Sequence, residues 1–359
     1  MQRHITRGVS AGGVRIGGGA PVSVQSMTNT DTRDTAATIA QILELERAGC
    51  EIVRVSVFDE ACARAIPAIH SAIHIPLVAD IHFDHRLAIA AAENGVDKLR
   101  LNPGNIGGRQ HVEKVVDCAR MHHTPIRIGV NGGSLEADLR REYGPDSPQA
   151  MVESAMRHVR LLEAAHFFDI VISLKSSTVS TTVEAYRQMA KLVEYPLHIG
   201  ITETGTPARG LIKSAAGLGA LLLDGIGDTL RISLTDAPVE EVRAGVELLR
   251  ALRLRRDDIE IISCPTCGRT RVDLMQAVKR VDAALPHGQG YLRVAVMGCA
   301  VNGPGEAADA DIGIAFGSGS GVLFRRGERF AHGAAEDMIA LLVREATAML
   351  RQRREEEAR

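Results

Sequence analysis

Short runs of β-forming residues alternate with helical patterns along the first two thirds of the chain. Apolar and polar residues alternate within each run, and the segments between the runs place apolar residues at helical spacing. The runs cover residues 21–28, 51–57, 76–83, 97–103, 125–131, 169–177, 196–205 and 228–235. Eight strand–helix units predict an α/β fold with a closed (β/α)8 TIM barrel. An open doubly wound sheet is the alternative, although it usually has fewer strands.

A different pattern begins near Ile259, where the strand–helix rhythm stops. Short strands and glycine-rich turns come first, and a helical run ends the chain. We therefore expect a (β/α)8 barrel domain over residues 1–256 and a separate α+β domain over residues 257–359. The glycine-rich segment at residues 5–18 is typical of a small hairpin, which would cap the closed end of the barrel.

One face of each predicted barrel strand is unusually polar. Because side chains alternate between the two faces of a strand, the aliphatic face meets the helices and the polar face points into the barrel. A barrel lumen is normally filled with branched apolar side chains. Here the inward positions near the carboxyl ends of the strands carry five cations, which are Arg54, Arg100, Arg127, Lys175 and Arg231.

The opposing carboxylates on the same strands are Asp80 and Glu203. Five cations less two carboxylates leave about three positive charges without a partner, and a buried unpaired cation is costly. Because guanidinium groups match phosphate oxygens, we expect a phosphate or diphosphate site at the barrel mouth. Internal ion pairs without a ligand are the alternative. His82, Asn102 and Asn131 share the inward face, where they either line the site or support its walls.

Composition narrows the class of function. The 359 residues carry 42 Lys and Arg against 44 Asp and Glu, a net charge of -2, which argues against a nucleic-acid binder. No apolar run approaches the ~20 residues needed to cross a membrane, and the N-terminus lacks the apolar segment of a signal peptide. We therefore expect a cytoplasmic protein.

The six cysteines fall into two groups. In a reducing compartment we expect no disulfides. Cys50, Cys62 and Cys118 lie in helical stretches and are expected in the core. Cys264 and Cys267 form a CxxC, which can bind one metal centre, and an apolar strand can deliver Cys299 to the same place.

Three thiolates without a fourth leave two kinds of metal site open. Zinc could take three cysteines and a histidine, but no histidine follows Cys299 closely. An iron–sulfur cluster could use three cysteines and an oxygen ligand. The nearest such ligand is Glu306, with Asp309 and Asp311 as competitors. Structural zinc or free buried thiols are the alternative to a cluster.

The segments CPTCGRT and GCAVNGPGE together resemble the signature of the 4-hydroxy-3-methylbut-2-enyl diphosphate synthase family, the iron–sulfur enzymes of the non-mevalonate isoprenoid pathway. The similarity extends over the whole chain, through VQSMTNTDTRD, VRVSV, ADIHFD, LRLNPGNIG, RIGVNGGSL and GITETG. It implies a pteroate-synthase-like barrel and an α+β iron–sulfur domain like a sulfite-reductase repeat. Some relatives carry an extra domain between these two, for which this chain has no room.

The resemblance also implies an activity and a site. The activity is the two-electron reductive ring opening and dehydration of 2-C-methyl-D-erythritol 2,4-cyclodiphosphate to (E)-4-hydroxy-3-methylbut-2-enyl diphosphate. Flavodoxin or ferredoxin would be the electron donor. The implied ligands of a [4Fe-4S] cluster are Cys264, Cys267, Cys299 and Glu306. The implied substrate-binding residues are Arg54, His82, Arg100, Asn102, Arg127, Asn131, Lys175, Arg231, Ser233 and Asn302.

Two glutamates are expected to be catalytic. Glu203 matches the barrel acid that acts near the reacting carbons, where it would supply or manage a proton. Glu306, as a carboxylate on iron, could exchange for a substrate oxygen. Because the barrel site and the cluster lie on different domains, the substrate must reach both, and the resemblance favours a head-to-tail homodimer.

Two other functions stay open. A [4Fe-4S]-dependent hydro-lyase acting on a phosphorylated small molecule would dehydrate its substrate without an external reductant. A non-catalytic iron–sulfur or zinc protein would leave the cationic lumen unexplained. Dependence on a reductant and binding of a diphosphate distinguish the three functions.

Overall fold

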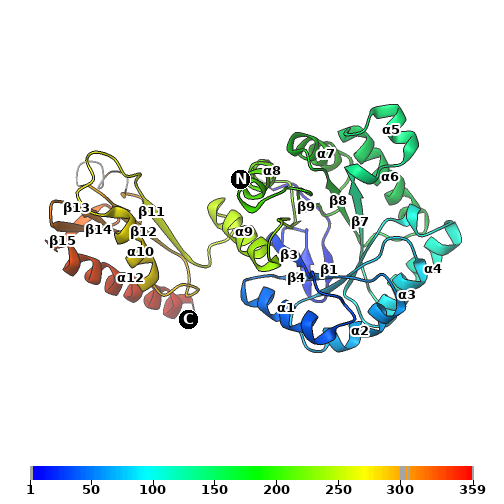
Figure 1. Cartoon of the computed structure of the whole chain (residues 1–359), viewed down its shortest axis with the longest axis horizontal. Helices are drawn as coiled ribbons and strands as arrows, with labels where there is room; N and C mark the ends of the chain where they lie inside the picture. Colours follow the sequence, from blue (N-terminus) through cyan, green and yellow to red (C-terminus); the bar gives the residue numbers. More distant parts are fainter. Residues whose placement is uncertain (1–2, 300–304, 306, 358–359) are drawn as a thin grey trace. The chain divides into compact units, whose positions relative to one another are not determined.

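The computed structural model describes residues 3–299, 305 and 307–357. The chain divides into two compact units, Met1–Leu254 and Arg255–Arg359. In the first unit, helices surround a ring of strands, as Figure 1 shows. The described part of the second unit combines a five-stranded sheet with helices α10 and α12.

The first unit is a parallel barrel made from the eight strands that the sequence pattern predicts. The strands are β3 (Ser23–Met27), β4 (Ile52–Ser56), β5 (Leu77–Asp80), β6 (Lys98–Leu101), β7 (Ile126–Asn131), β8 (Ile170–Lys175), β9 (His198–Ile199) and β10 (Thr229–Leu230). Their order in the sheet is β8-β7-β6-β5-β4-β3-β10-β9, and every pairing is parallel. A bridge between Ile172 and Leu197 closes the ring.

The last two barrel strands are shorter than the pattern predicts. The runs 196–205 and 228–235 were expected as strands, but β9 and β10 contain two residues each. Beyond β9, Glu203 has a φ of 53°. This left-handed conformation lies outside the β region, so an extended strand cannot continue through it.

Helices connect the strands and enclose the barrel (Figure 1). They are α1 (Thr35–Arg47), α2 (Glu60–His70), α3 (His85–Glu93), α4 (Arg109–Met121), α5 (Ala137–Tyr143), α6 (Pro148–Ala164), α7 (Val179–Leu192), α8 (Pro207–Leu223) and α9 (Pro238–Ala251). The first three begin at aspartates, Asp34, Asp59 and Asp84, whose side chains accept a backbone N–H of the first turn. Among the described residues, no helix has both the length and the apolar character that a membrane crossing requires.

The aliphatic faces of the strands and the inner faces of the helices form one hydrophobic core. On β4, for example, Val53 and Val55 are completely buried in it. Cys50 and Cys62 lie within this core and Cys118 packs against it, as expected, although only Cys62 and Cys118 are on helices and Cys50 lies in the segment between α1 and β4. Burial raises the pKa of the Cys50 thiol to about 12, so this thiol stays protonated.

The hairpin predicted near the N-terminus is formed by β1 (Val9–Ala11) and β2 (Val14–Ile16), which pair antiparallel. It closes the barrel at the amino ends of the strands. Its side chains pack with inward-facing aliphatic side chains of β4, β5 and β8 in a separate cluster, which contains Val9, Ala11, Ile16, Ile52, Val78 and Val171.

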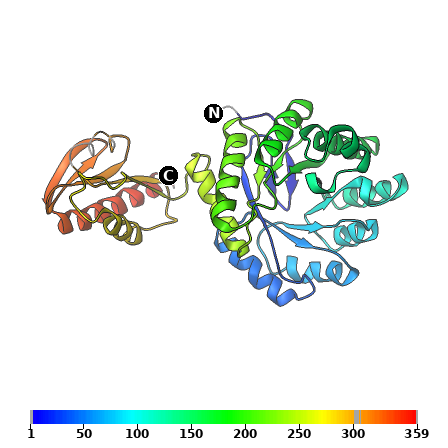
Figure 2. The same cartoon turned by 45° about the horizontal axis from the view of Figure 1, so that its top comes forward.

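The second unit is built on a five-stranded mixed sheet. Its strands are β11 (Ile259–Ser263), β12 (Leu292–Met297), β13 (Ile312–Phe316), β14 (Ser320–Arg325) and β15 (Glu328–Ala334), in that order. The first three pair parallel, and β14 and β15 continue antiparallel. Helices α10 (Leu274–Ala284) and α12 (Ala335–Glu357) cover one face, where they share a hydrophobic core with the sheet (Figures 1 and 2).

Candidate active site

A small polar pocket of about 140 Å³ lies at the carboxyl ends of the barrel strands. The strands β4 to β10, or the residues directly after them, all contribute to its wall. The lining residues are Arg54, Asp80, His82, Arg100, Arg127, Asn131, Ser173, Lys175, Thr202, Arg231 and Ser233. Eight of the residues that the resemblance implies for substrate binding lie here, namely Arg54, His82, Arg100, Arg127, Asn131, Lys175, Arg231 and Ser233.

Asp80 holds two of the arginines. Its Oδ1 accepts a hydrogen bond from Arg100 Nη1 at 3.1 Å, and its Oδ2 lies 3.7 Å from Arg54 Nε. Burial alone would raise the pKa of Asp80, but the charges of Arg54 and Arg100 outweigh it and lower the pKa to about 2. Asp80 is therefore ionised at neutral pH and fixes both guanidinium groups.

Arg231 is paired with a carboxylate that does not come from a strand. Its Nη2 donates to Glu241 Oε2 at 3.1 Å, and the other oxygen of Glu241 accepts the backbone N–H of Leu234 at 2.9 Å. Glu241 lies in the first turn of α9 and is 5% exposed. It therefore fixes both the guanidinium of Arg231 and the backbone that follows β10.

The helical spacing of α9, rather than the strand pattern, indicates that Glu241 is a buried carboxylate. The buried stripe of α9 includes Pro238, Val242, Gly245 and Leu249, and Glu241 falls on the same stripe at helical spacing. A glutamate on the buried face of a helix needs a cationic partner. The second carboxylate that compensates the cations is thus Glu241. Glu203, expected in this role, makes no ion pair with any described residue.

The pocket keeps an excess of positive charge. Five cations line it, and two carboxylates, Asp80 and Glu241, pair with Arg54, Arg100 and Arg231. Arg127 and Lys175 make no ion pair with any described residue. Burial, together with the repulsion of the other cations, lowers the pKa of Lys175 well below its ordinary value. An anion of two or more charges would match this excess.

Two glycines make room for the cations. A Cβ on Gly129 would lie 2.4 Å from Nε of Arg100, and one on Gly200 would lie 2.8 Å from Nζ of Lys175. The side chains of Arg100 and Lys175 therefore cross the neighbouring strands at positions where only glycine fits. Arg100 Nη2 also donates to the Gly129 carbonyl at 2.8 Å.

The side chain of Asn102, just after β6, bonds to the backbone of the neighbouring strand β7. Its Oδ1 accepts the backbone N–H of Gly129 at 2.8 Å, and it is not among the residues of the pocket wall. Glu203 follows β9 and is also absent from the wall of this pocket. The predicted residues Asn302 and Glu306 lie outside the described residues.

Two further contacts orient the arginines. Nη1 of Arg100 lies 3.3 Å from Nε2 of His82, and because arginine only donates, this imidazole nitrogen accepts. The sulfur of Met27 accepts from Arg54 at 2.9 and 3.1 Å and lies 3.7 Å from Arg231 Nη1. Met27 is an inward residue of β3 that residue type alone offers no reason to select, because thioethers are only weak acceptors.

The CxxC lies where two parallel strands end. Ser263 on β11 is paired with Val296 on β12, so Cys264 and Cys299 both follow the same edge of the sheet. The backbone N–H of Gly298 donates to Sγ of Cys264 at 3.3 Å. The turn that contains Cys267 returns to this edge, where Arg271 N donates to the Gly298 carbonyl at 3.0 Å.

The donor set fits an iron–sulfur centre. All three cysteines are free thiols, and hydrogen bonding from the backbone of Arg269 lowers the pKa of Cys267, which favours its thiolate. An N–H directed at the Cys264 sulfur is a contact that tunes such centres. Among the described residues, no three His, Cys, Asp or Glu side chains yet gather as a metal ion requires. Asp311, a competitor for Glu306, is engaged elsewhere, by the backbone of Arg293 and by Arg353.

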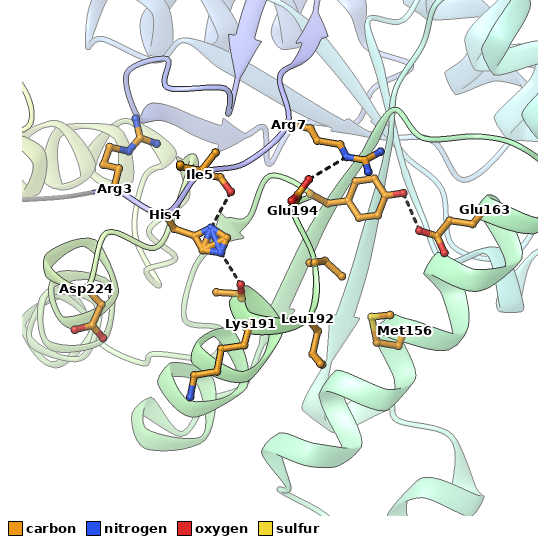
Figure 3. Close-up of a pocket in the computed structure, with 13 residues that line it drawn as sticks. Arg3, His4, Ile5, Arg7, Met156, Glu163, Lys191, Leu192, Glu194 and Asp224 are labelled. Atoms are coloured by element: carbon orange, nitrogen blue, oxygen red, sulfur yellow. Dashed lines mark hydrogen bonds and ion pairs between the residues drawn. The ribbon is translucent and has the colours of Figure 1, made fainter.

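A larger pocket of about 950 Å³ lies against the N-terminal segment and the C-terminal part of α7 (Figure 3). Its charged groups are largely satisfied from within. Arg7 forms an ion pair with Glu194 at 3.7 Å, and the hydroxyl of Tyr195 donates to Glu163 at 2.9 Å. Unlike the barrel pocket, it has no excess of buried positive charge, so the barrel pocket is the stronger candidate for an anionic substrate.

Comparison with known proteins gives two family matches that together cover most of the chain. The GcpE TIM-barrel domain matches residues 6–246, and the GcpE protein C-terminal domain matches residues 260–348. These two ranges fall on the two units of the structure.

Curated relatives match over nearly their full length, and all three named here are 4-hydroxy-3-methylbut-2-en-1-yl diphosphate synthases (flavodoxin). The protein of Clostridium perfringens is 54% identical over 344 residues, which is 96% of this chain and 99% of the relative. The protein of Nitratidesulfovibrio vulgaris is 55% identical over 358 residues, which is 99% of this chain and 92% of the relative. The protein of Geobacter sulfurreducens is 56% identical over 345 residues, which is 96% of this chain and 98% of the relative.

Solved structures were also matched. The dihydropteroate synthase of Yersinia pestis superimposes with a TM-score of 0.48 at 14% identity, over 70% of this chain and 100% of that chain.

Proposed function

Because the chain belongs to the GcpE family, we propose that it converts 2-C-methyl-D-erythritol 2,4-cyclodiphosphate into (E)-4-hydroxy-3-methylbut-2-enyl diphosphate. It is an iron–sulfur oxidoreductase of isoprenoid biosynthesis. The reaction takes up two electrons and two protons, breaks the carbon–oxygen bond that closes the ring, and releases one water. The observation that carries the proposal is the barrel pocket, in which five cations face two carboxylates.

The diphosphate binds where the positive charge lacks a partner. Arg127 and Lys175 provide the unpaired charges, and Arg54 and Arg100 present guanidinium groups that Asp80 already orients. Ring opening leaves a phosphate oxygen with a new negative charge. Preorganised donors stabilise such a charge because they need no rearrangement when it forms.

The remaining predicted residues act around the carbon skeleton. Asn131, His82 and Ser233 line the wall beside the cations and offer neutral hydrogen bonds to the hydroxyl groups of the substrate. Arg231 completes the cationic side of the pocket, and Asn102 supports the wall through Gly129. Glu203 is assigned to proton transfer at the reacting carbons.

Cys264, Cys267, Cys299 and Glu306 are the proposed ligands of a [4Fe-4S] cluster, and Asn302 is the proposed contact to substrate from the same segment. When bound, such a cluster supplies electrons one at a time. Flavodoxin is the proposed donor, as the names of the relatives indicate, and ferredoxin is a chemically equivalent one-electron donor. We further propose that the protein is cytoplasmic and acts as a head-to-tail homodimer, in which the substrate reaches both domains.

Anaerobic purification followed by iron and sulfide analysis tests the cofactor, and turnover of the cyclodiphosphate with and without reduced flavodoxin tests the reaction. We expect iron and sulfide in equal amounts and product only with reductant. Cys264→Ser should lose the cluster, whereas Cys118→Ser, a thiol packed against the barrel core, should keep it. Turnover without reductant would indicate a hydro-lyase, and a colourless zinc protein would refute the proposal.

The pocket is tested separately by removing one cation. Arg100→Met should raise the KM for the cyclodiphosphate at least about 30-fold, because one partner of a buried charge-assisted contact is lost. Arg109→Met is the matched control, since Arg109 lies on the surface and pairs with Glu113 at 2.8 Å. Equal KM values for the two variants would contradict a diphosphate site in the barrel.

A further inference from the structure

Below the pocket, the barrel contains a second group of inward polar side chains that the proposed reaction does not use. They lie two residues before pocket or site residues on four strands, so they are about 6.6–6.8 Å deeper along each strand. The pairs are Lys98 and Arg100 on β6, Gln25 and Met27 on β3, His198 on β9 with Gly200 just after it, and Thr229 on β10 with Arg231 just after it.

These side chains are closed off from solvent on every side. Lys98, His198 and Thr229 are 0% exposed and Gln25 is 1% exposed. Beneath them, the aliphatic cluster of the N-terminal hairpin and the strand bases closes the barrel. Above them lies the cationic wall of the pocket. Water from outside the protein therefore does not reach this layer directly.

The polar atoms of this layer have no hydrogen-bond partner among the described residues. They include Nζ of Lys98, both ring nitrogens of His198, both amide atoms of Gln25 and the hydroxyl of Thr229. Nε and Nη1 of Arg127, a residue that also lines the pocket, are likewise buried without a partner. Buried polar atoms are rarely left unpaired, so these atoms require a bound partner.

The charge of this layer decides whether water or an anion is the better hydrogen-bond partner for these buried atoms. Arginine stays protonated in proteins, and no described carboxylate forms an ion pair with Arg127 or Lys98. Burial and the nearby charges of Arg127 and Arg54 lower the pKa of Lys98 well below its ordinary value. Water would satisfy the hydrogen bonds but would leave the charge of Arg127 buried and uncompensated whenever no diphosphate is bound in the pocket above, which is costly. A small anion satisfies both requirements.

We propose that the barrel holds a second anion site beneath the substrate pocket, which takes a small monovalent anion such as chloride between Lys98, Arg127 and His198. The closed surroundings favour a compact ion over a phosphate. Arg127 links the two sites, since it lines the pocket, two of its nitrogens are buried without a partner, and its charge acts on both Lys98 and His198. The inner anion offsets its charge and fixes its guanidinium for the diphosphate.

Bromide provides the direct test, because it replaces chloride and has anomalous scattering. Crystals of the full protein grown in sodium bromide should show an anomalous peak among Lys98, Arg127 and His198. A layer filled only by water, with bromide peaks confined to the surface, would overturn the proposal. This outcome is independent of the reaction, so it leaves the proposed function untouched.

Thermal unfolding of the full chain provides a second test. At a tenfold excess over its Kd, chloride should raise the Tm by about 2–3 °C relative to gluconate at equal ionic strength. Lys98→Met should abolish this difference, and Lys114→Met, at an exposed lysine, should keep it. Equal Tm values in the two salts, or a chloride effect that persists in Lys98→Met, would refute the site. If Lys98→Met does not fold, the bromide map decides.

Discussion

Asp80→Asn should have opposite effects on the stability of the fold and on the binding of anions. The substitution keeps the shape of the side chain and removes the negative charge that lies 3.1 Å from Arg100 and 3.7 Å from Arg54. The barrel then contains one more uncompensated positive charge. This charge destabilises the folded protein without a ligand and attracts a phosphate-bearing ligand more strongly.

The magnitude follows from burial and from the pKa of Asp80. A lowering of this pKa from 3.8 to about 2 corresponds to about 2–3 kcal/mol of stability. Because the folded pKa lies below the unfolded one, this stability is present above pH 4 and is lost as the pH falls toward 2. Breaking a buried pair by removing one partner costs about 3–5 kcal/mol. We therefore expect Asp80→Asn to lower the free energy of unfolding by about 3 kcal/mol.

Urea unfolding at pH 7 measures the loss of stability, and calorimetry with inorganic pyrophosphate measures the gain in affinity, expected to be about tenfold. Asp117→Asn is the control, since Asp117 pairs with Arg120 at 3.0 Å on the surface and should change stability by less than about 1 kcal/mol. Wild-type stability in Asp80→Asn would refute the reasoning. Weaker pyrophosphate binding would show that Asp80 acts mainly by orienting the arginines.

Three further substitutions test other parts of the pocket. Glu241→Gln keeps the acceptor for the Leu234 N–H but removes the charge that pairs with Arg231, so, as in Asp80→Asn, urea unfolding should show a loss of about 3 kcal/mol. Gly200→Ala places a Cβ 2.8 Å from Nζ of Lys175 and should cost about 1–3 kcal/mol in urea unfolding, whereas Gly133→Ala meets nothing within 4 Å and should be neutral. Because burial and the other cations lower the pKa of Lys175 in the free protein and an anion raises it again, binding of the cyclodiphosphate should be accompanied by proton uptake and should weaken as the pH rises. Calorimetry in two buffers of different ionisation enthalpy measures this uptake, which Lys175→Met should remove.

Much of the barrel could be predicted from local pattern alone. Alternation of side chains assigns Arg100 and Arg127 to the lumen and Leu99 and Ile128 to the helices, because strand geometry fixes the two faces without knowledge of the fold. The lengths of β9 and β10 could not be predicted in the same way. The run 196–205 contains Glu203, whose left-handed conformation interrupts an extended strand, and the residue type alone does not reveal this conformation.

The partners of the cations were harder to predict than the cations themselves. Asp80 could be found because it lies on a strand beside Arg54 and Arg100. Glu241 lies on a helix, and only the folded register of α9 brings it to 3.1 Å from Arg231. Gly129 was also missed, because the sequence shows a glycine but not the guanidinium that crosses it.

The way the two carboxylates are shared among the five cations gives a physical reason for a lysine, rather than an arginine, at position 175. Asp80 and Glu241 compensate the arginines at positions 54, 100 and 231, so the remaining excess lies on Arg127 and Lys175. An arginine cannot lose its proton at physiological pH, whereas a buried lysine can. Burial and the neighbouring cations lower the pKa of Lys175, so a lysine here can reduce the charge of the unliganded lumen more readily than an arginine, and a bound diphosphate opposes this lowering. A barrel with arginine at this position would carry the full charge in both states and would be less stable without its ligand.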